Sequence, residues 1–242
     1  SQAPKDGTWL GAFASGPLLD PVIGPRKVNY GISDFAAIGA IDKDNGLCTT
    51  WHTSPVKTLE DARKREVTVA GTGAGSSTDT EPLVLNETLG TKFRVITGYL
   101  GTQETAIAVE RGEADGRCGF GYASIKTSKP DWISDKKIIM LVQSALRKPK
   151  DLQDAPLLAD LAKSEDDKRI FELLATAAEL GRPLVAAPGT PPDRMQALHA
   201  AYRAMLADPE FVAEAAQLLG CSTNRIRMAE DDGRLPPPPA GE

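Results

Sequence analysis

Residues 67–90 place a β-rich run directly before a glycine-rich loop and a helical pattern. The run VTVAG leads into GTGAGSSTDT, where glycines alternate with small residues and hydroxyl residues follow. The first backbone N–H groups of a helix have no intrahelical partner, and the helix dipole makes that end positive. The stretch therefore predicts an anion-binding turn at a helix N-terminus. The candidate ligand-binding residues of this loop are Gly73, Gly75, Ser76, Ser77 and Thr78.

The loop does not match the established phosphate-binding or dinucleotide-binding motifs. A P-loop needs G-x-x-x-x-G-K-[ST], and a dinucleotide fingerprint needs a third glycine where Ser76 stands. Glycine permits tight turns of many kinds, so a purely structural turn is the alternative interpretation. The sequence alone leaves both interpretations open.

Composition limits the classes of partner. The chain has 242 residues, a formal net charge of −5 and a calculated pI near 5.2. Nucleic-acid binding requires a basic face, so we expect no nucleic-acid partner. No apolar run approaches the ~20 residues of a membrane-spanning helix. The length is enough for one large domain or for two lobes.

The three cysteines, Cys48, Cys118 and Cys221, lie far apart and form no C-x-x-C pair. This spacing favours separate buried thiols over a structural zinc site. We therefore expect neither a metal nor a cofactor.

Catalytic signatures are weak. His52 and His199 are the two histidines, and no G-x-S-x-G elbow is present. Ser76 and Ser77 have no base nearby in the sequence. The sequence does not require an enzyme.

Strand and helix patterns alternate along the chain, which predicts an α/β fold with a mainly parallel sheet. Asn45-Gly46 predicts a hairpin within 34–51, and Thr58 with Asp61 fits a capping box. A continuous apolar centre predicts a buried parallel strand at 136–145. Three loops, GTGAGSS, GYLGTQE and ADGRCGF, are predicted as strand-to-helix junctions, and we expect them to line one crevice at the carboxyl ends of neighbouring parallel strands.

The run GTGAGSS…LNETLGTKFRVITGYLGTQETAIAVERGEADG resembles the substrate-binding receptors of tripartite tricarboxylate transporters, also called Bug proteins. GRPLVAAPGTPPDRMQALHAAYRAMLADPEF and APKDGTWLG are similar to the same family. The resemblance implies a type II periplasmic-binding fold, with two α/β lobes around a hinged cleft. It also implies a periplasmic receptor, not an enzyme, that holds a small organic carboxylate and presents it to a membrane permease.

The resemblance also assigns site residues beyond the glycine-rich loop. Tyr99, Gly101 and Thr102 match the family's G-Y-x-G loop, and Asp115 with Gly116 matches its R-G-E-x-D-G signature. The loop after the first strand, with Ser15 and Gly16, stands where the first lobe contributes ligand contacts.

The two expected lobes comprise residues 1–52 plus 182–242, and residues 53–181. In the family, a strand, a loop and a helix precede the segment that corresponds to APKDGT. We expect a second copy of the chain, or a separate N-terminal piece, to pair with the strand at 8–14 and complete the first lobe.

Two other functions stay open at this point. A degenerate homologue could serve as a sensor or interaction protein, and its cleft would be filled. A small enzyme could use the glycine-rich loop for a phosphorylated substrate, and it would need a base or a metal beside the loop.

Overall fold

The protein is described by a computed structural model that covers residues 3–12, 21, 28–31, 34–40, 44–149, 152–181 and 183–218. The chain divides into two compact units. Unit 1 comprises Ser1–Lys43 and Leu180–Glu242, and unit 2 comprises Asp44–Glu179. Each unit has its own sheet.

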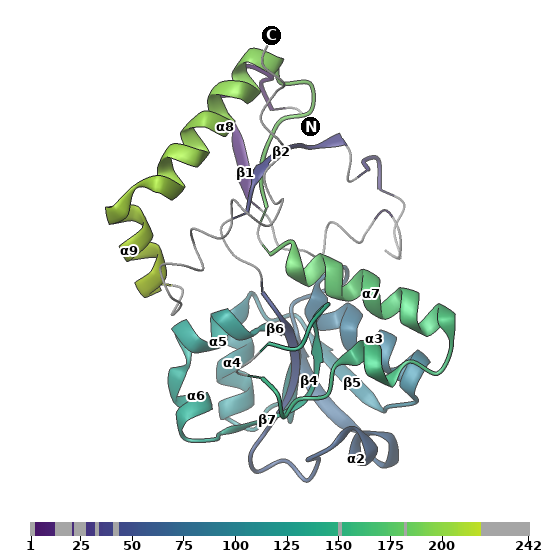
Figure 1. Cartoon of the computed structure of the whole chain (residues 1–242). Coiled ribbons are helices and arrows are strands. Elements are labelled where there is room, and N and C mark those ends of the chain that lie inside the picture. Colours follow the sequence, from purple (N-terminus) through teal and green to yellow (C-terminus); the bar gives the residue numbers. More distant parts are fainter. Residues whose placement is uncertain are drawn as a thin grey trace. The chain divides into compact units, whose positions relative to one another are not determined.

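The sheet of unit 2 has five strands in the order β5-β4-β6-β3-β7 (Figure 1). Along the chain these strands are β3 (Gly46–Trp51), β4 (Val67–Gly71), β5 (Phe93–Thr97), β6 (Gly116–Gly121) and β7 (Ile138–Ser144). β4 lies parallel to both β5 and β6, whereas β3 lies antiparallel to both β6 and β7. The sheet is therefore mixed, and its parallel part positions the glycine-rich loop.

Two sequence predictions about this sheet are wrong. β7 is antiparallel to β3, because an apolar run reports burial on both faces and not strand direction. The predicted hairpin around Asn45-Gly46 does not form. β2 (Ala36–Gly39) pairs with β8 (Leu184–Ala186) in unit 1, while β3 pairs within unit 2, so the tertiary partners override the local turn signal.

Helices cover both faces of the unit 2 sheet. Figure 1 shows α4, α5 and α6 on one side and α3 on the other. The helical elements of this unit are α2 (Leu59–Lys64), α3 (Ser77–Leu89), α4 (Thr102–Glu110), α5 (Tyr122–Ser128), α6 (Pro130–Ser134), the 3₁₀ turn η2 (Leu158–Leu161) and α7 (Glu165–Glu179). Phe120, Trp132 and Ile125 are fully buried in the core beneath α4, α5 and α6.

Local helix signals in the sequence are confirmed. Thr58 and Asp61 form the capping box of α2, in which each side chain bonds the other residue's backbone. Gly90 ends α3 in the left-handed conformation, with φ of 71°. These two ends fix the segments that flank β4.

A disulfide joins Cys48 of β3 to Cys118 of β6. The sequence interpretation of separate thiols is therefore wrong for these two residues, since strands that are 70 positions apart in sequence are neighbours in the sheet. Cys221 lies outside the described residues. The crosslink ties β6, the strand beside β4, to the antiparallel half of the sheet.

Unit 1 contains the antiparallel sheet β1-β8-β2, in which β1 comprises Leu10–Ala12. α8 (Pro192–Ala207) and α9 (Pro209–Leu218) pack on it around Ile38, Tyr202 and Leu206. β1 is an edge strand of the described sheet, with Trp9 beside it and 61% exposed. Its pairing with a second copy or another piece stays a prediction.

The units divide at different positions from the predicted lobes. Residues 44–52, which the sequence assigned to the first lobe, lie in unit 2 because β3 forms the centre of the unit 2 sheet. The second division falls between Glu179 and Leu180. None of the described helices combines the length and hydropathy needed to cross a membrane.

Candidate functional site

The glycine-rich loop connects β4 to the N-terminus of α3, as the sequence predicts for that stretch. Gly73 and Gly75 have φ of 128° and 87°, in a region that side-chain-bearing residues rarely adopt. The loop conformation therefore depends on glycine at both positions. Ser76 is the N-cap of α3, and Ser77 begins the helix.

A carboxylate of the chain itself, Asp79, lies inside this loop. Its Oδ1 accepts hydrogen bonds from the backbone N–H of Gly73 at 3.2 Å, from the Ser76 hydroxyl at 3.2 Å and from the Thr78 hydroxyl at 3.1 Å. Asp79 is 8% exposed. The hydroxyls of Ser76 and Thr78 are thus engaged within the loop, and they also contact each other at 2.7 Å.

Other donors of the loop have no partner within the described residues. These are the backbone N–H groups of Gly75, Ser77 and Thr78, which precede the first intrahelical bonds of α3. Gly119 of β6 lies against Ser77 and Thr78, because a Cβ there would stand 2.8 Å from the Thr78 nitrogen. This arrangement offers backbone donors to an anion at the positive end of a helix of 13 residues.

The second predicted loop lies next to the first, since β5 is parallel to β4. The Tyr99 N–H donates to the carbonyl of Gly71 at 3.3 Å, which joins the two loops. Gly101 is the N-cap of α4, and Thr102 is its first residue. The N–H groups of Gly101 and Thr102 have no partner in the described part of the chain. The structure therefore brings Tyr99, Gly101 and Thr102 to the edge of the sheet where the glycine-rich loop lies.

Asp115 and Gly116 do not lie at that edge. The Asp115 carboxylate accepts hydrogen bonds from the N–H and hydroxyl of Thr68 at 2.9 and 2.8 Å, near the start of β4. At Gly116 a Cβ would stand 2.0 Å from the Thr49 carbonyl, so this glycine permits the close approach of β3 and β6. Asp115 precedes β6 and Gly116 is its first residue, whereas the candidate anion-binding edge lies at the carboxyl end of β4. These contacts support the strand pairing, and a ligand-binding role of Asp115 and Gly116 stays a prediction.

Two buried charged residues, Glu81 and Arg117, were not found by sequence reasoning. Glu81 accepts a hydrogen bond from the Gly119 N–H at 2.9 Å, and burial raises its pKa to about 7 against the opposing effects of that bond and of Arg117. Burial also lowers the pKa of Arg117 to about 10, with the charge of Glu81 acting against it. Neither residue belongs to a motif. For Asp79, by contrast, the S-x-x-D spacing from Ser76 is a signal that could have indicated a carboxylate at the helix start.

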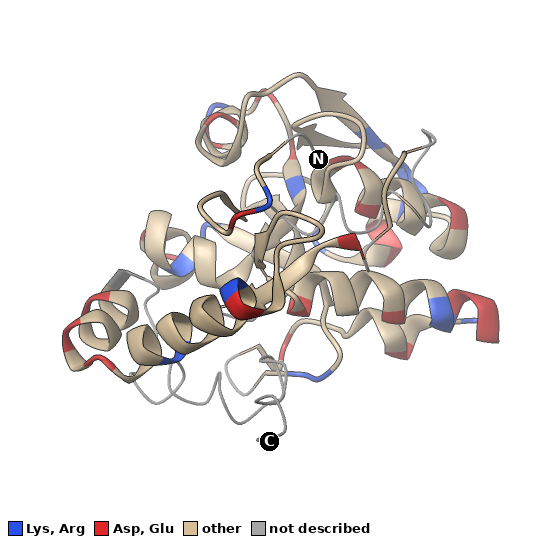
Figure 2. Ribbon diagram, turned by 90° about the horizontal axis from the view of Figure 1, so that it is seen from above, with Lys and Arg blue, Asp and Glu red and all other residues tan. Residues whose placement is uncertain are grey.

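Ser15 and Gly16 lie outside the described residues, so the structure places neither. In the part that is described, no group of three or more His, Cys, Asp and Glu residues has the arrangement to hold a metal ion. Acidic and basic residues are interspersed along the described helices in Figure 2.

Comparison with known proteins gives the fold. No model of a protein family matches the sequence, and no curated protein matches it significantly. Among solved structures, MatC from Rhodopseudomonas palustris, determined with bound malate, is similar with a TM-score of 0.68 and 19% identity over 95% of this chain and 78% of that one. The periplasmic binding protein BugD has a TM-score of 0.67 and 21% identity over 95% of this chain and 74% of its own.

A third neighbour is a TctC solute-binding protein from Polaromonas, with a TM-score of 0.61 and 19% identity over 90% of this chain and 70% of its own. These likenesses confirm the predicted α/β fold of the periplasmic binding proteins. They also confirm, at the level of fold, the resemblance to the TctC and Bug receptors that the sequence indicates.

Proposed function

We propose that this chain is a periplasmic solute-binding receptor that captures a small organic carboxylate and delivers it to the permease of a tripartite transporter. One observation carries the proposal. Two helix N-termini, those of α3 and α4, stand at the carboxyl ends of the adjacent parallel strands β4 and β5, and their first N–H groups have no partner among the described residues. Each hydrogen bond to a carboxylate stabilises the complex by ~1.5–3 kcal/mol.

The comparisons support this function through the fold. The similar structures are solute-binding proteins, and MatC was solved with malate. The disulfide between Cys48 and Cys118 supports a location outside the reducing cytosol. The ligand-binding roles of Gly75, Ser77 and Thr78 are part of the proposal.

The chemistry of the loop does not favour the enzyme alternative. The Ser76 hydroxyl lies 2.7 Å from the Gly73 carbonyl and 3.2 Å from the Asp79 carboxylate, and the Ser77 hydroxyl lies 3.5 Å from the Gly119 carbonyl. In the described residues no histidine or lysine contacts either hydroxyl, and the carboxylate that contacts Ser76, Asp79, also accepts the Gly73 N–H, so the loop shows no serine–histidine or serine–lysine pair.

One observation favours a second candidate, a non-transport homologue that acts as a sensor or interaction protein. Asp79 lies within hydrogen-bond distance of three donors of the loop, which reduces what remains for a ligand. Whether the N–H groups that Asp79 does not contact bind a carboxylate distinguishes the receptor from the non-transport homologue.

A thermal-shift screen tests the proposed function. The purified chain is heated with mono-, di- and tricarboxylates, each at several concentrations. A ligand at one hundred times its Kd stabilises the folded state by about 2.7 kcal/mol, so a receptor shows a concentration-dependent rise in Tm with at least one acid. An unchanged Tm across the whole panel would favour the non-transport homologue.

A further inference from the structure

Arg117 is a buried cation that forms no ion-pair contact among the described residues, although the charge of the buried Glu81 acts on it. It is 4% exposed, and its Nε has no hydrogen-bond partner in the described part of the chain. Its Nη1 donates to the Thr102 carbonyl at 3.3 Å, and its guanidinium lies 4.0 Å from the centre of the Phe120 ring. A carbonyl and an aromatic ring compensate only part of the cost of burying a full charge.

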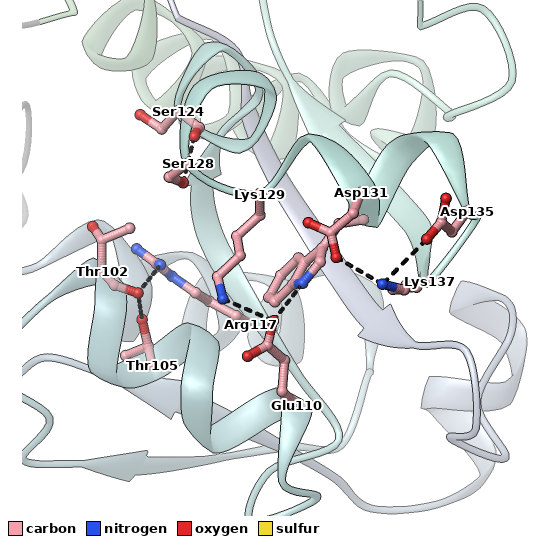
Figure 3. A network of polar contacts seen from close by, with 11 residues as sticks. Thr102, Thr105, Glu110, Arg117, Ser124, Ser128, Lys129, Asp131, Asp135 and Lys137 are labelled. Atoms are coloured by element: carbon pink, nitrogen blue, oxygen red, sulfur yellow. Dashed lines mark hydrogen bonds and ion pairs between the residues drawn. The ribbon is translucent and has the colours of Figure 1, made fainter.

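Two acidic side chains of unit 2, Glu81 and Glu110, make their hydrogen bonds with groups other than Arg117. Glu81 accepts its hydrogen bond from the Gly119 N–H, and its charge acts on Arg117 without an ion-pair contact in the described structure. Glu110 accepts hydrogen bonds from Lys129 at 2.8 Å and from the Trp132 indole at 2.9 Å. Figure 3 shows Arg117 directed at the first turn of α4, toward Thr102, while Lys129 is the residue that reaches Glu110.

An anion in addition to Glu81 would make this position electrostatically more favourable. The first turn of α4 is the positive end of the helix dipole, and a cation there is repelled. The acidic residue of that turn, Glu104, accepts a hydrogen bond from the Leu100 N–H at 2.7 Å and so holds the preceding loop. The buried charge and the unpaired N–H groups of Gly101 and Thr102 together make a site that an external anion would neutralise.

We propose that Arg117 is the charge of an anion subsite at the N-terminus of α4, and that it selects ligands with an anionic group at that position. The N–H groups of α4 contact the anion, and Arg117 acts from beneath the first helical turn as a positioning residue. This inference rests on the proposed carboxylate-binding function. It adds a second anionic group of the ligand, distinct from the one that the glycine-rich loop holds.

The test uses probe acids that differ from their partners by one charge. The probes are succinate, malate and adipate, each compared with its monoamide by isothermal titration calorimetry. The variants are Arg117→Met, which removes the charge, and Arg117→Lys, which keeps it. The control is Arg94→Met, which makes the same charge change at an exposed residue of β5 that pairs with Glu66.

We expect the parent and the Arg94→Met control to prefer a dianion to its monoamide by about tenfold or more, the effect of 1.4 kcal/mol in binding free energy. Arg117→Met should lose that preference while it keeps most of its affinity for the monoamide, and Arg117→Lys should recover part of the preference. Thermal unfolding without ligand checks that each variant is folded.

The outcomes separate the two proposals. Equal preference in the parent and in Arg117→Met, an equal loss of affinity for both members of a pair, or a parent with no preference for dianions would each overturn the role of Arg117 while leaving the receptor function intact. A parent that binds no carboxylate of the wider panel would overturn the receptor function, and the subsite with it.

Discussion

Residues that carry charge or require glycine determine the chemistry of the candidate site. Asp79 takes part of the donor capacity of the glycine-rich loop, and Arg117 places a positive charge under α4. Glu81 lies one helical turn beyond Ser77 and supports Gly119, which packs against the start of α3. Single substitutions at these positions should therefore separate binding from stability.

Gly75→Val should abolish carboxylate binding, because valine rarely adopts the φ of 87° that the loop requires. Gly90→Val is the matched control: its φ is 71°, it ends the same helix, and a Cβ there meets no other atom within 4 Å. Both variants should lose ~1–2 kcal/mol of stability from the left-handed strain. Calorimetric titration should show lost binding for Gly75→Val alone. Parent-like binding by Gly75→Val would mean that the loop is only structural.

Glu81 should make stability depend on pH. Its pKa is raised from 4.5 to about 7, so between these values the folded state keeps a proton that the unfolded state releases. Stability should therefore fall as the pH rises from about 4.5 to about 7, by roughly 3 kcal/mol, and change little from this group above that range.

Glu81→Gln should flatten this dependence, since glutamine stays neutral and its amide oxygen can still accept from Gly119. Urea unfolding at a series of pH values measures the slope. Glu172→Gln, an exposed change on α7, is the control and should keep the slope of the parent. A slope in Glu81→Gln equal to that of the parent would show that another group is responsible.

At the level of elements, the sequence correctly predicted the helix ends that depend on residues close together in the chain. The capping box at Thr58 and the end of α3 at Gly90 depend on neighbours in the chain, and both are confirmed. The loops before α3 and α4 could also be predicted, because their glycine and hydroxyl residues are neighbours in the chain.

Features that depend on strand pairing were not predicted. Cys48 meets Cys118, and Asp115 bonds Thr68, only because β6 inserts between β3 and β4. Arg117 likewise reaches α4 through this order of strands. A single sequence does not specify which distant strands are neighbours, so these contacts required the structure.

The disulfide between β3 and β6 should stabilise unit 2. The double variant Cys48→Ala, Cys118→Ala should lose about 2–5 kcal/mol of unfolding free energy, the usual effect of removing a native disulfide. Chemical denaturation of the oxidised parent, the reduced parent and the double variant measures this. Reduction should lower the unfolding free energy of the parent toward that of the double variant. If all three unfold at the same denaturant concentration, the crosslink contributes nothing to stability.

At the scale of the whole molecule, the fold determines where the candidate anion site lies and which groups form it. The chain shares the architecture of periplasmic binding proteins, and the candidate anion site lies entirely within unit 2. The donors are backbone groups of two adjacent loops, which explains how an acidic chain with a net charge of −5 could bind an anion. The central claim is that a carboxylate binds to these N–H groups.

Backbone amide NMR tests that claim most directly. Titration of the labelled chain with an acid identified in the thermal screen should shift the amide resonances of Gly75, Ser77 and Thr78, together with those of Gly101 and Thr102. The amide of Thr68, at the opposite end of β4, should move least. A carboxylate that binds the chain but leaves the resonances of both loops unchanged would contradict the account.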